Sequence, residues 1–166
     1  NIQELFLYQN WGKLKNIINY LKNFNCEIIC LQEVFCNNSK MEIINELKNE
    51  FPYYLSGSLH KKYIIGEDSG LLVLAKYPIK FIKEVTLRNM RLPDSMAYKT
   101  LLYFQVNNIN FLTTHLQSDY MSISEKQISD LIKYSPFKNF IITGDINNSN
   151  LYKILKIECN NLVNTC

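Results

Sequence analysis

Residues 140–147, FIITGDIN, decide the fold class, because they join a short apolar strand to a polar turn. FIIT has the composition of a buried strand, and Gly144 allows a tight turn after it. Asp145 and Asn147 are two positions apart, so in an extended turn their side chains share one face. A carboxylate beside an amide suits a water nucleophile and a phosphoryl oxygen. Alone, GDIN is also well explained as a polar turn built from common turn residues.

Apolar strands alternate with helices along the rest of the chain, which indicates an α/β fold. We expect strands at residues 1–5 (the tail of a strand), 27–31, 53–57, 71–75, 81–87, 100–106, 110–114 and 140–143. We expect helices at residues 11–24, 39–49 and 122–134, the last two with capping residues Ser39 and Glu42, and Ser122 and Glu125. The Asn107-Asn108 pair predicts a tight hairpin turn. Two groups of strands and helices predict two sheets packed face to face, with the helices outside.

Two further segments place polar side chains directly after apolar strands. Glu33 lies in LQEVF (31–35), where a carboxylate next to a buried strand is costly unless it is paired or bound to metal. Mg²⁺ takes one or two carboxylates and keeps several waters, so Glu33 is a candidate ligand. His115 lies in TTHLQSD (113–119) and can donate a hydrogen bond to a phosphoryl oxygen. Taken singly, Glu33 fits an exposed strand end better, and His115 fits a structural histidine equally well.

Length and composition fit one globular domain with a sizeable core: the chain has 166 residues, 47% hydrophobic and 20% charged. The net charge of +3 fits a phosphate-bearing substrate but is weaker than that of a dedicated nucleic-acid binder. The 5 cysteines form no CxxC pair. This argues against a zinc site and a disulfide framework and favours a reducing, cytoplasmic compartment. No apolar stretch reaches the roughly 18 residues that a membrane helix needs.

Four segments, in this order, resemble the endonuclease/exonuclease/phosphatase superfamily. They are QE (32–33), SGLLVLAKYPI (69–79), THLQ (114–117) and GDIN (144–147), and NIQ (1–3) is similar to the end of the family's opening strand. LQEVF and THLQSD look closest to the neutral sphingomyelinase-like branch. Asp94, five residues before Lys99, is similar to an Asp/Lys pair of that branch.

The resemblance implies a four-layer αββα sandwich of two packed mixed sheets with outer helices, incomplete at both ends. It also implies a magnesium-dependent phosphodiester hydrolase, with Mn²⁺ as an alternative metal, in which water attacks the phosphodiester in line. By similarity, Glu33 is the principal metal ligand, with Asn1 beside it. Asp145 positions the attacking water, and Asn147 and His115 hold the phosphoryl oxygens.

The same resemblance places Asp94 and Lys99 on the rim that faces the substrate. It favours a lipid headgroup over nucleic acid as the substrate and implies peripheral membrane contact without a transmembrane segment. Residues 59–65 and 87–96 are candidates for a membrane-facing loop. A nuclease of the same superfamily and a non-catalytic binding protein are the alternatives.

The family's closing Ser-Asp-His motif, whose histidine is the general base, has no counterpart, because no histidine follows His115. The chain is then either part of a longer protein or a relative that has lost the base. The greater length of family members favours the first. We therefore expect residues 1–166 to form one partial domain, without its start and its C-terminal catalytic segment, and to be poorly active alone.

Overall fold

The computed structural model describes residues 2–57, 68–87, 98–118 and 120–151. In these ranges the helices are α1 (Ile2–Lys22), α2 (Asn37–Leu47) and α3 (Met121–Lys133). The strands are β1 (Ile28–Leu31), β2 (Tyr53–Ser56), β3 (Leu72–Ala75), β4 (Ile79–Thr86), β5 (Thr100–Val106), β6 (Ile109–His115) and β7 (Ile141–Asp145). Each of these strands overlaps a predicted one, because the buried apolar runs of the sequence set their positions.

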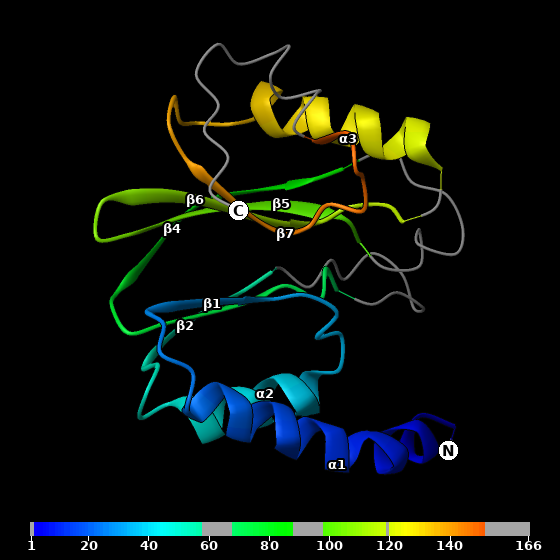
Figure 1. Ribbon diagram of the computed structural model, residues 1–166, viewed down its shortest axis with the longest axis vertical. Coiled ribbons are helices and arrows are strands. Elements are labelled where there is room, and N and C mark those ends of the chain that lie inside the picture. The colour runs from blue at the N-terminus through cyan, green and yellow to red at the C-terminus, as the bar shows by residue number, and fades with distance from the viewer. Residues whose placement is uncertain (1, 58–67, 88–97, 119, 152–166) are drawn as a thin grey trace.

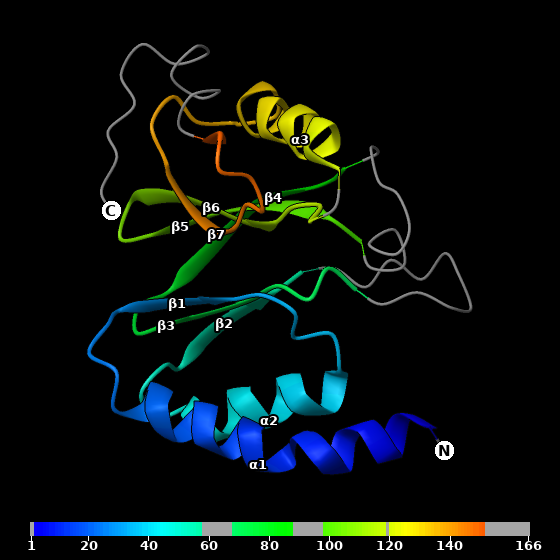
Figure 2. The same cartoon turned by 45° about the vertical axis from the view of Figure 1, so that its right-hand side comes forward.

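The elements form four layers, helices–sheet–sheet–helix, as Figure 1 shows from one side and Figure 2 after a turn of 45°. Helices α1 and α2 cover the outer face of the first sheet, whose strand order is β1-β3-β2. Helix α3 covers the outer face of the second sheet, whose order is β4-β5-β6-β7. The predicted sandwich is therefore confirmed. The second sheet is mixed, whereas the described pairings of the first are all antiparallel.

Three apolar clusters separate these layers, one at each interface. The central cluster lies between the sheets and consists of Leu71, Val73, Ala75, Leu102, Phe104, Val106 and Phe111. Alternate residues of β3 point the other way, so Leu72 and Leu74 pack in the cluster under α1 and α2. On the far side, Tyr103 and Leu112 pack with Ile128 and Leu131 of α3. Strands β3 and β5 are thus buried on both faces, which explains why apolar residues dominate them.

The connection β6–α3–β7 places two strand ends side by side, because it joins parallel neighbours through a crossover helix. Its close packing requires glycine at position 144, where φ is +118° and a Cβ would lie 2.0 Å from the Thr114 carbonyl oxygen. The preceding hairpin turns at Asn107 and Asn108, with φ of 50° and 62°, as predicted. The register that results sets His115 opposite Asp145.

One predicted strand and two predicted helix caps are wrong. Residues 2–5 belong to α1 instead of a strand, because Gln, Glu and Leu favour helix and nothing separates them from the amphipathic stretch that follows. Helix α2 begins at Asn37 with Cys36 as N-cap, and no side chain caps it, so Ser39 lies inside the helix. Helix α3 likewise begins at Met121, after Tyr120, which leaves Ser122 inside.

Several expectations fall outside the described residues. Asn1, Asp94 and the candidate membrane loop at 59–65 are among them, as is all of 87–96 except Leu87. Among the helices that the structure describes, none combines the length and apolar character needed to cross a membrane.

Candidate active site

Two of the predicted site residues lie at the carboxyl ends of neighbouring parallel strands. His115 is the last residue of β6 and pairs in register with Asp145, the last residue of β7. The ladder continues one step further, because the Leu116 amide donates to the Asp145 carbonyl oxygen at 2.9 Å. A parallel pair presents both strand ends at one sheet edge, where side chains of both can face one ligand. Backbone pairing therefore fixes the spacing of His115 and Asp145.

The turn after β7 brings Asn147 to the same edge. The Asn147 amide donates to the Asp145 Oδ1 atom at 3.0 Å, which closes an Asx turn. Asn147 has a φ of 50°, and its Nδ2 atom donates to the Leu116 carbonyl oxygen at 3.0 Å. The side chains of Asp145 and Asn147 are thus held by local hydrogen bonds. The amide of Asn147 has a second N–H, and the exposed carboxylate of Asp145 a second oxygen, to offer to a ligand.

Glu33 reaches this edge from the other sheet. It follows β1 with a φ of 62°, and its Oε1 atom lies 3.9 Å from the Nε2 atom of His115. The carboxylate side chain is 70% exposed, whereas His115 is buried. Four predicted site residues from three strand ends thus gather at one edge of the sandwich. Glu33 and His115 meet across the interface between the two sheets.

Helix α3 holds the loops after β6 and β7 through two buried polar residues, Ser124 and Gln127, for which the sequence predicts no role. The Gln127 Oε1 atom accepts the Gln117 amide at 2.9 Å. The Asn148 Nδ2 atom donates to the Ser124 Oγ atom at 2.8 Å. Ser124 and Gln127 share the buried stripe of α3 with Ile128 and Leu131. Polar residues within an otherwise apolar stripe were the signal that they hydrogen-bond inside the protein.

Of the remaining predicted residues, Lys99 is the one that the structure describes. Lys99 lies immediately before β5 and is buried, and its carbonyl oxygen accepts the Leu87 amide at 2.9 Å. Because β5 and β6 are antiparallel, the start of β5 lies beside the end of β6 that carries His115. A substrate-binding role for Lys99, and roles for Asn1 and Asp94, stay predictions.

The donor set fits a magnesium ion held largely by water. Among the residues that the structure describes, no three His, Cys, Asp or Glu side chains form a metal-binding group. Mg²⁺ does not need such a cage, since it is usually bound through one or two carboxylates and keeps several waters. Glu33 offers an exposed carboxylate and Asp145 a second one at the same edge. Hard oxygen donors of this kind favour Mg²⁺ or Mn²⁺ over zinc.

The cysteine on β1, the strand that precedes Glu33, is not a candidate nucleophile. Cys30 lies on β1 beside the central apolar cluster, and burial raises the pKa of its thiol. A thiol rather than a thiolate is therefore present at neutral pH, and the thiolate is the nucleophilic form. The candidate reactive groups at this edge are therefore the carboxylates, the amide and the imidazole.

Comparison with known proteins agrees with this architecture. Residues 9–151 match the model of the Endonuclease/Exonuclease/phosphatase family. Sphingomyelinase C of Bacillus cereus is 26% identical over 176 residues, which cover 85% of this chain and 52% of that protein. Phospholipase C of Staphylococcus aureus is 24% identical over 177 residues, with the same coverage of both chains. The chain thus spans about half the length of these relatives.

Solved structures show the same fold. A beta toxin variant from Staphylococcus aureus with bound magnesium ions has a TM-score of 0.69 at 23% identity, covering 95% of this chain and 67% of its own. Sphingomyelinase C from Streptomyces griseocarneus has a TM-score of 0.65 at 18% identity, covering 92% of this chain and 64% of its own. The chain belongs to the endonuclease/exonuclease/phosphatase family. Its sequence relatives support the sphingomyelinase-like branch of that family.

Proposed function

We propose that this chain carries the larger part of the active site of a magnesium-dependent phosphodiester hydrolase that cleaves a choline-phosphate lipid in the manner of a sphingomyelinase. The observation that carries the proposal is the meeting of Glu33 with His115 at 3.9 Å, at the sheet edge that also holds Asp145. These groups come from both sheets, and an idle protein surface has no physical need to combine them. The sphingomyelinase C and phospholipase C relatives support the reaction class.

Each residue takes the role that its chemistry allows. Glu33 holds the metal, which supplies Lewis-acid stabilisation of the scissile phosphate when bound. Asp145 accepts a hydrogen bond from the attacking water and orients it toward phosphorus, with its other oxygen fixed by the Asn147 amide. His115 and Asn147 donate hydrogen bonds to the phosphoryl oxygens as negative charge builds, each worth about 3 kcal/mol by analogy with oxyanion donors.

The proposed substrate is a lipid headgroup in preference to nucleic acid. The net charge of +3 is small for a protein that tracks a polyanion. A nuclease at the same site would show steep loss of affinity with salt, whereas cleavage of a zwitterionic headgroup would not. Substrate preference and salt dependence therefore separate the two activities.

The proposal is tested with the full-length protein, Mg²⁺ and sphingomyelin vesicles, with bis-p-nitrophenyl phosphate and single-stranded DNA as further substrates. We expect hydrolysis of the vesicles and the small phosphodiester, and a loss of at least about 100-fold in kcat for Glu33→Gln, because the metal loses its carboxylate. Glu27→Gln is the matched control: this exposed glutamate lies just before the other end of β1.

Unchanged turnover by Glu33→Gln would remove that carboxylate from the mechanism. Cleavage of DNA but not of lipid would replace the proposed substrate with nucleic acid. A full-length protein that hydrolyses no phosphodiester would favour the non-catalytic alternative.

A further inference from the structure

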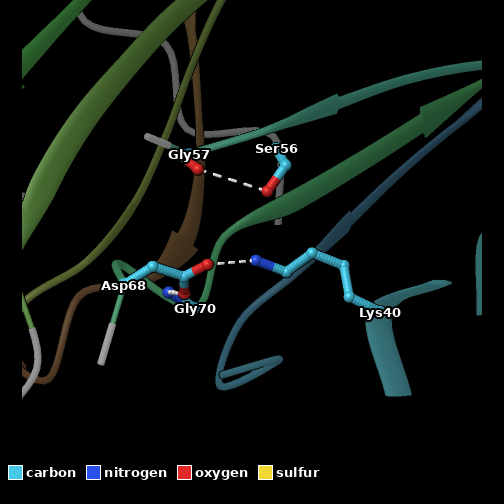
Figure 3. A network of polar contacts seen from close by, with 5 residues as sticks. All are labelled: Lys40, Ser56, Gly57, Asp68 and Gly70. Atoms are coloured by element: carbon cyan, nitrogen blue, oxygen red, sulfur yellow. Dashed lines mark hydrogen bonds and ion pairs between the residues drawn. The ribbon is translucent and has the colours of Figure 1, made fainter. Parts of the chain in front are cut away.

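A buried ion pair lies behind the loop that carries Glu33. Lys40 extends from α2 to the carboxylate of Asp68, just before β3, as Figure 3 shows. The side chains are 6% and 1% exposed, respectively, so both charges are removed from water. Burying two charges is costly, and the cost is offset only when their geometry and remaining hydrogen bonds are good.

Asp68 connects this pair to the backbone of the Glu33 loop. The Asp68 Oδ1 atom accepts the Gly70 amide at 2.7 Å, while Oδ2 pairs with Lys40 (Figure 3). The Gly70 carbonyl oxygen in turn accepts the Val34 amide at 2.9 Å. Val34 follows Glu33 directly in the chain. A continuous set of contacts therefore runs from α2 to the residue next to the proposed metal ligand.

The backbone of Glu33 needs these contacts more than a residue within a strand would, because it lies beyond the strand pairing of β1. Its φ of 62° is uncommon for a residue with a side chain and persists only where the surroundings hold it. Its side chain is 70% exposed, so packing does little to orient it. Gly70 is equally constrained, with a φ of +65° and its α-carbon so close to Phe35 that a Cβ would lie 2.6 Å from the ring.

We propose that Lys40 and Asp68 are positioning residues that fix the backbone of Glu33 and so set the affinity of the metal site. The inference rests on the proposed function, since it assigns the pair a role through Glu33. Asp68 is not itself assigned as a ligand, because one of its oxygens is paired with Lys40 and the other accepts the Gly70 amide. Residues that orient a metal ligand typically alter metal affinity when they are removed, and this pair acts on Glu33 through the backbone of Gly70 and Val34.

The test measures binding of Mn²⁺ alone, without substrate, to the full-length protein by calorimetry. The main variant is the double substitution Lys40→Met with Asp68→Asn, which removes both charges and leaves an acceptor for the Gly70 amide. We expect Mn²⁺ affinity to fall by about 10–100-fold. Lys40→Met alone should bind Mn²⁺ as weakly but unfold more easily, because it leaves the Asp68 charge buried and unpaired.

Two comparisons separate positioning from a merely structural role. If the pair only stabilises the fold, the double variant should regain Mn²⁺ affinity along with stability relative to Lys40→Met. If the ion pair acts through Glu33, the double substitution should cause no further loss of Mn²⁺ affinity when it is made in the Glu33→Gln background. Lys22→Met is the matched control, because it breaks an exposed ion pair, 2.8 Å long, to Glu46 at the other end of α2. It should leave Mn²⁺ affinity unchanged.

Wild-type Mn²⁺ affinity in the folded double variant would overturn the inference, as would a loss of affinity that persists in the Glu33→Gln background. In both cases the proposed function stands, provided that Glu33→Gln itself weakens Mn²⁺ binding. If Glu33→Gln binds Mn²⁺ like the wild type, the proposed function fails and the inference fails with it. Should this double variant not fold, Lys40→Gln with Asp68→Asn takes its place, because it also removes both charges and keeps polar groups at both positions, with the same expected results.

Discussion

The two halves of the candidate site are held in different ways. In the second sheet, His115 and Asp145 are register partners of a parallel ladder, and the following loops are held by neutral hydrogen bonds that Gln127 and Ser124 of α3 accept. In the first sheet, Glu33 lies beyond the end of its strand, in a left-handed conformation, and the support behind it includes a buried ion pair. One half is fixed by backbone pairing, the other by tertiary contacts.

The difference indicates which part of the site is easier to disturb. A ladder fixes the spacing of two strand ends wherever the sheet is folded, so His115 and Asp145 stay together in any variant that keeps β6 and β7 paired. The position of Glu33 depends on separate side chains that are distant in sequence, from α2 and from the segment before β3. Substitutions of reactive groups should therefore lower kcat most in the second sheet. Substitutions that disturb the backbone support should alter the site most in the first sheet.

The strongest effect should be on kcat, from a change in the part of the site that the second sheet carries. Asp145→Asn keeps the shape and the Asx turn but removes the carboxylate that orients water, so kcat should fall by about 10²–10⁴-fold with little loss of stability. Asp130→Asn, on α3, is the matched control and should retain activity. Steady-state kinetics of the full-length protein measures both, and normal turnover by Asp145→Asn would end its proposed role.

The next effect compares the stability of the two supports. Lys40→Met leaves the Asp68 carboxylate buried without its cation and should lower the free energy of unfolding by about 3–5 kcal/mol. Gln127→Met removes the neutral acceptor of the Gln117 amide and should cost about 1–3 kcal/mol. Urea unfolding, read as a change in midpoint at constant slope, gives both values. If Gln127→Met lost as much free energy of unfolding as Lys40→Met, or more, the expected difference between the charged and the neutral support would be wrong.

The weakest effect should be on the pH dependence of stability, through Asp130 of α3. Burial raises the pKa of Asp130, with Lys133 acting in the opposite direction. A carboxyl group whose pKa is higher in the folded protein than in the unfolded chain stabilises the fold at pH values below the unfolded-state pKa. This stabilisation is lost as the pH rises through the folded-state pKa. Asp130→Asn should therefore unfold at a slightly higher temperature than wild type at pH 7, with the gap narrowing toward pH 3. If the difference in unfolding temperature widened on acidification, the pKa of Asp130 would be lowered by folding, which would contradict the prediction.

Most of the fold could be predicted from local patterns. Buried runs such as 71–75 and 100–106 became strands because apolar residues with β-branched and aromatic members fit a sheet covered on both faces. The Asn107-Asn108 turn followed from the tolerance of asparagine for positive φ. Helix starts were harder, because Asn37, Asn38 and Ser39 are all good capping residues, yet α2 begins at Asn37 with Cys36 as its N-cap and no side-chain cap.

The site could be predicted only in part. The strand-end positions of Glu33, His115, Asp145 and Asn147 are visible in the sequence. The pairing of Lys40 with Asp68 is not, because the two residues lie 28 positions apart and each looks like a surface charge. The one local signal is that Lys40 shares the buried stripe of α2 with Ile43, Ile44 and Leu47. Long-range charge pairing depends on the fold, which local periodicity does not specify.

The proposal to test first is that carboxylate, imidazole and amide groups from both sheets line one metal-dependent phosphodiesterase site. Its most direct test is the anomalous difference density of a crystal of the full-length protein soaked in Mn²⁺. We predict a peak at coordination distance from the Glu33 carboxylate, facing His115 and Asp145, that is absent from Glu33→Gln crystals. A Mn²⁺ ion bound elsewhere, with no density at Glu33, would contradict the account.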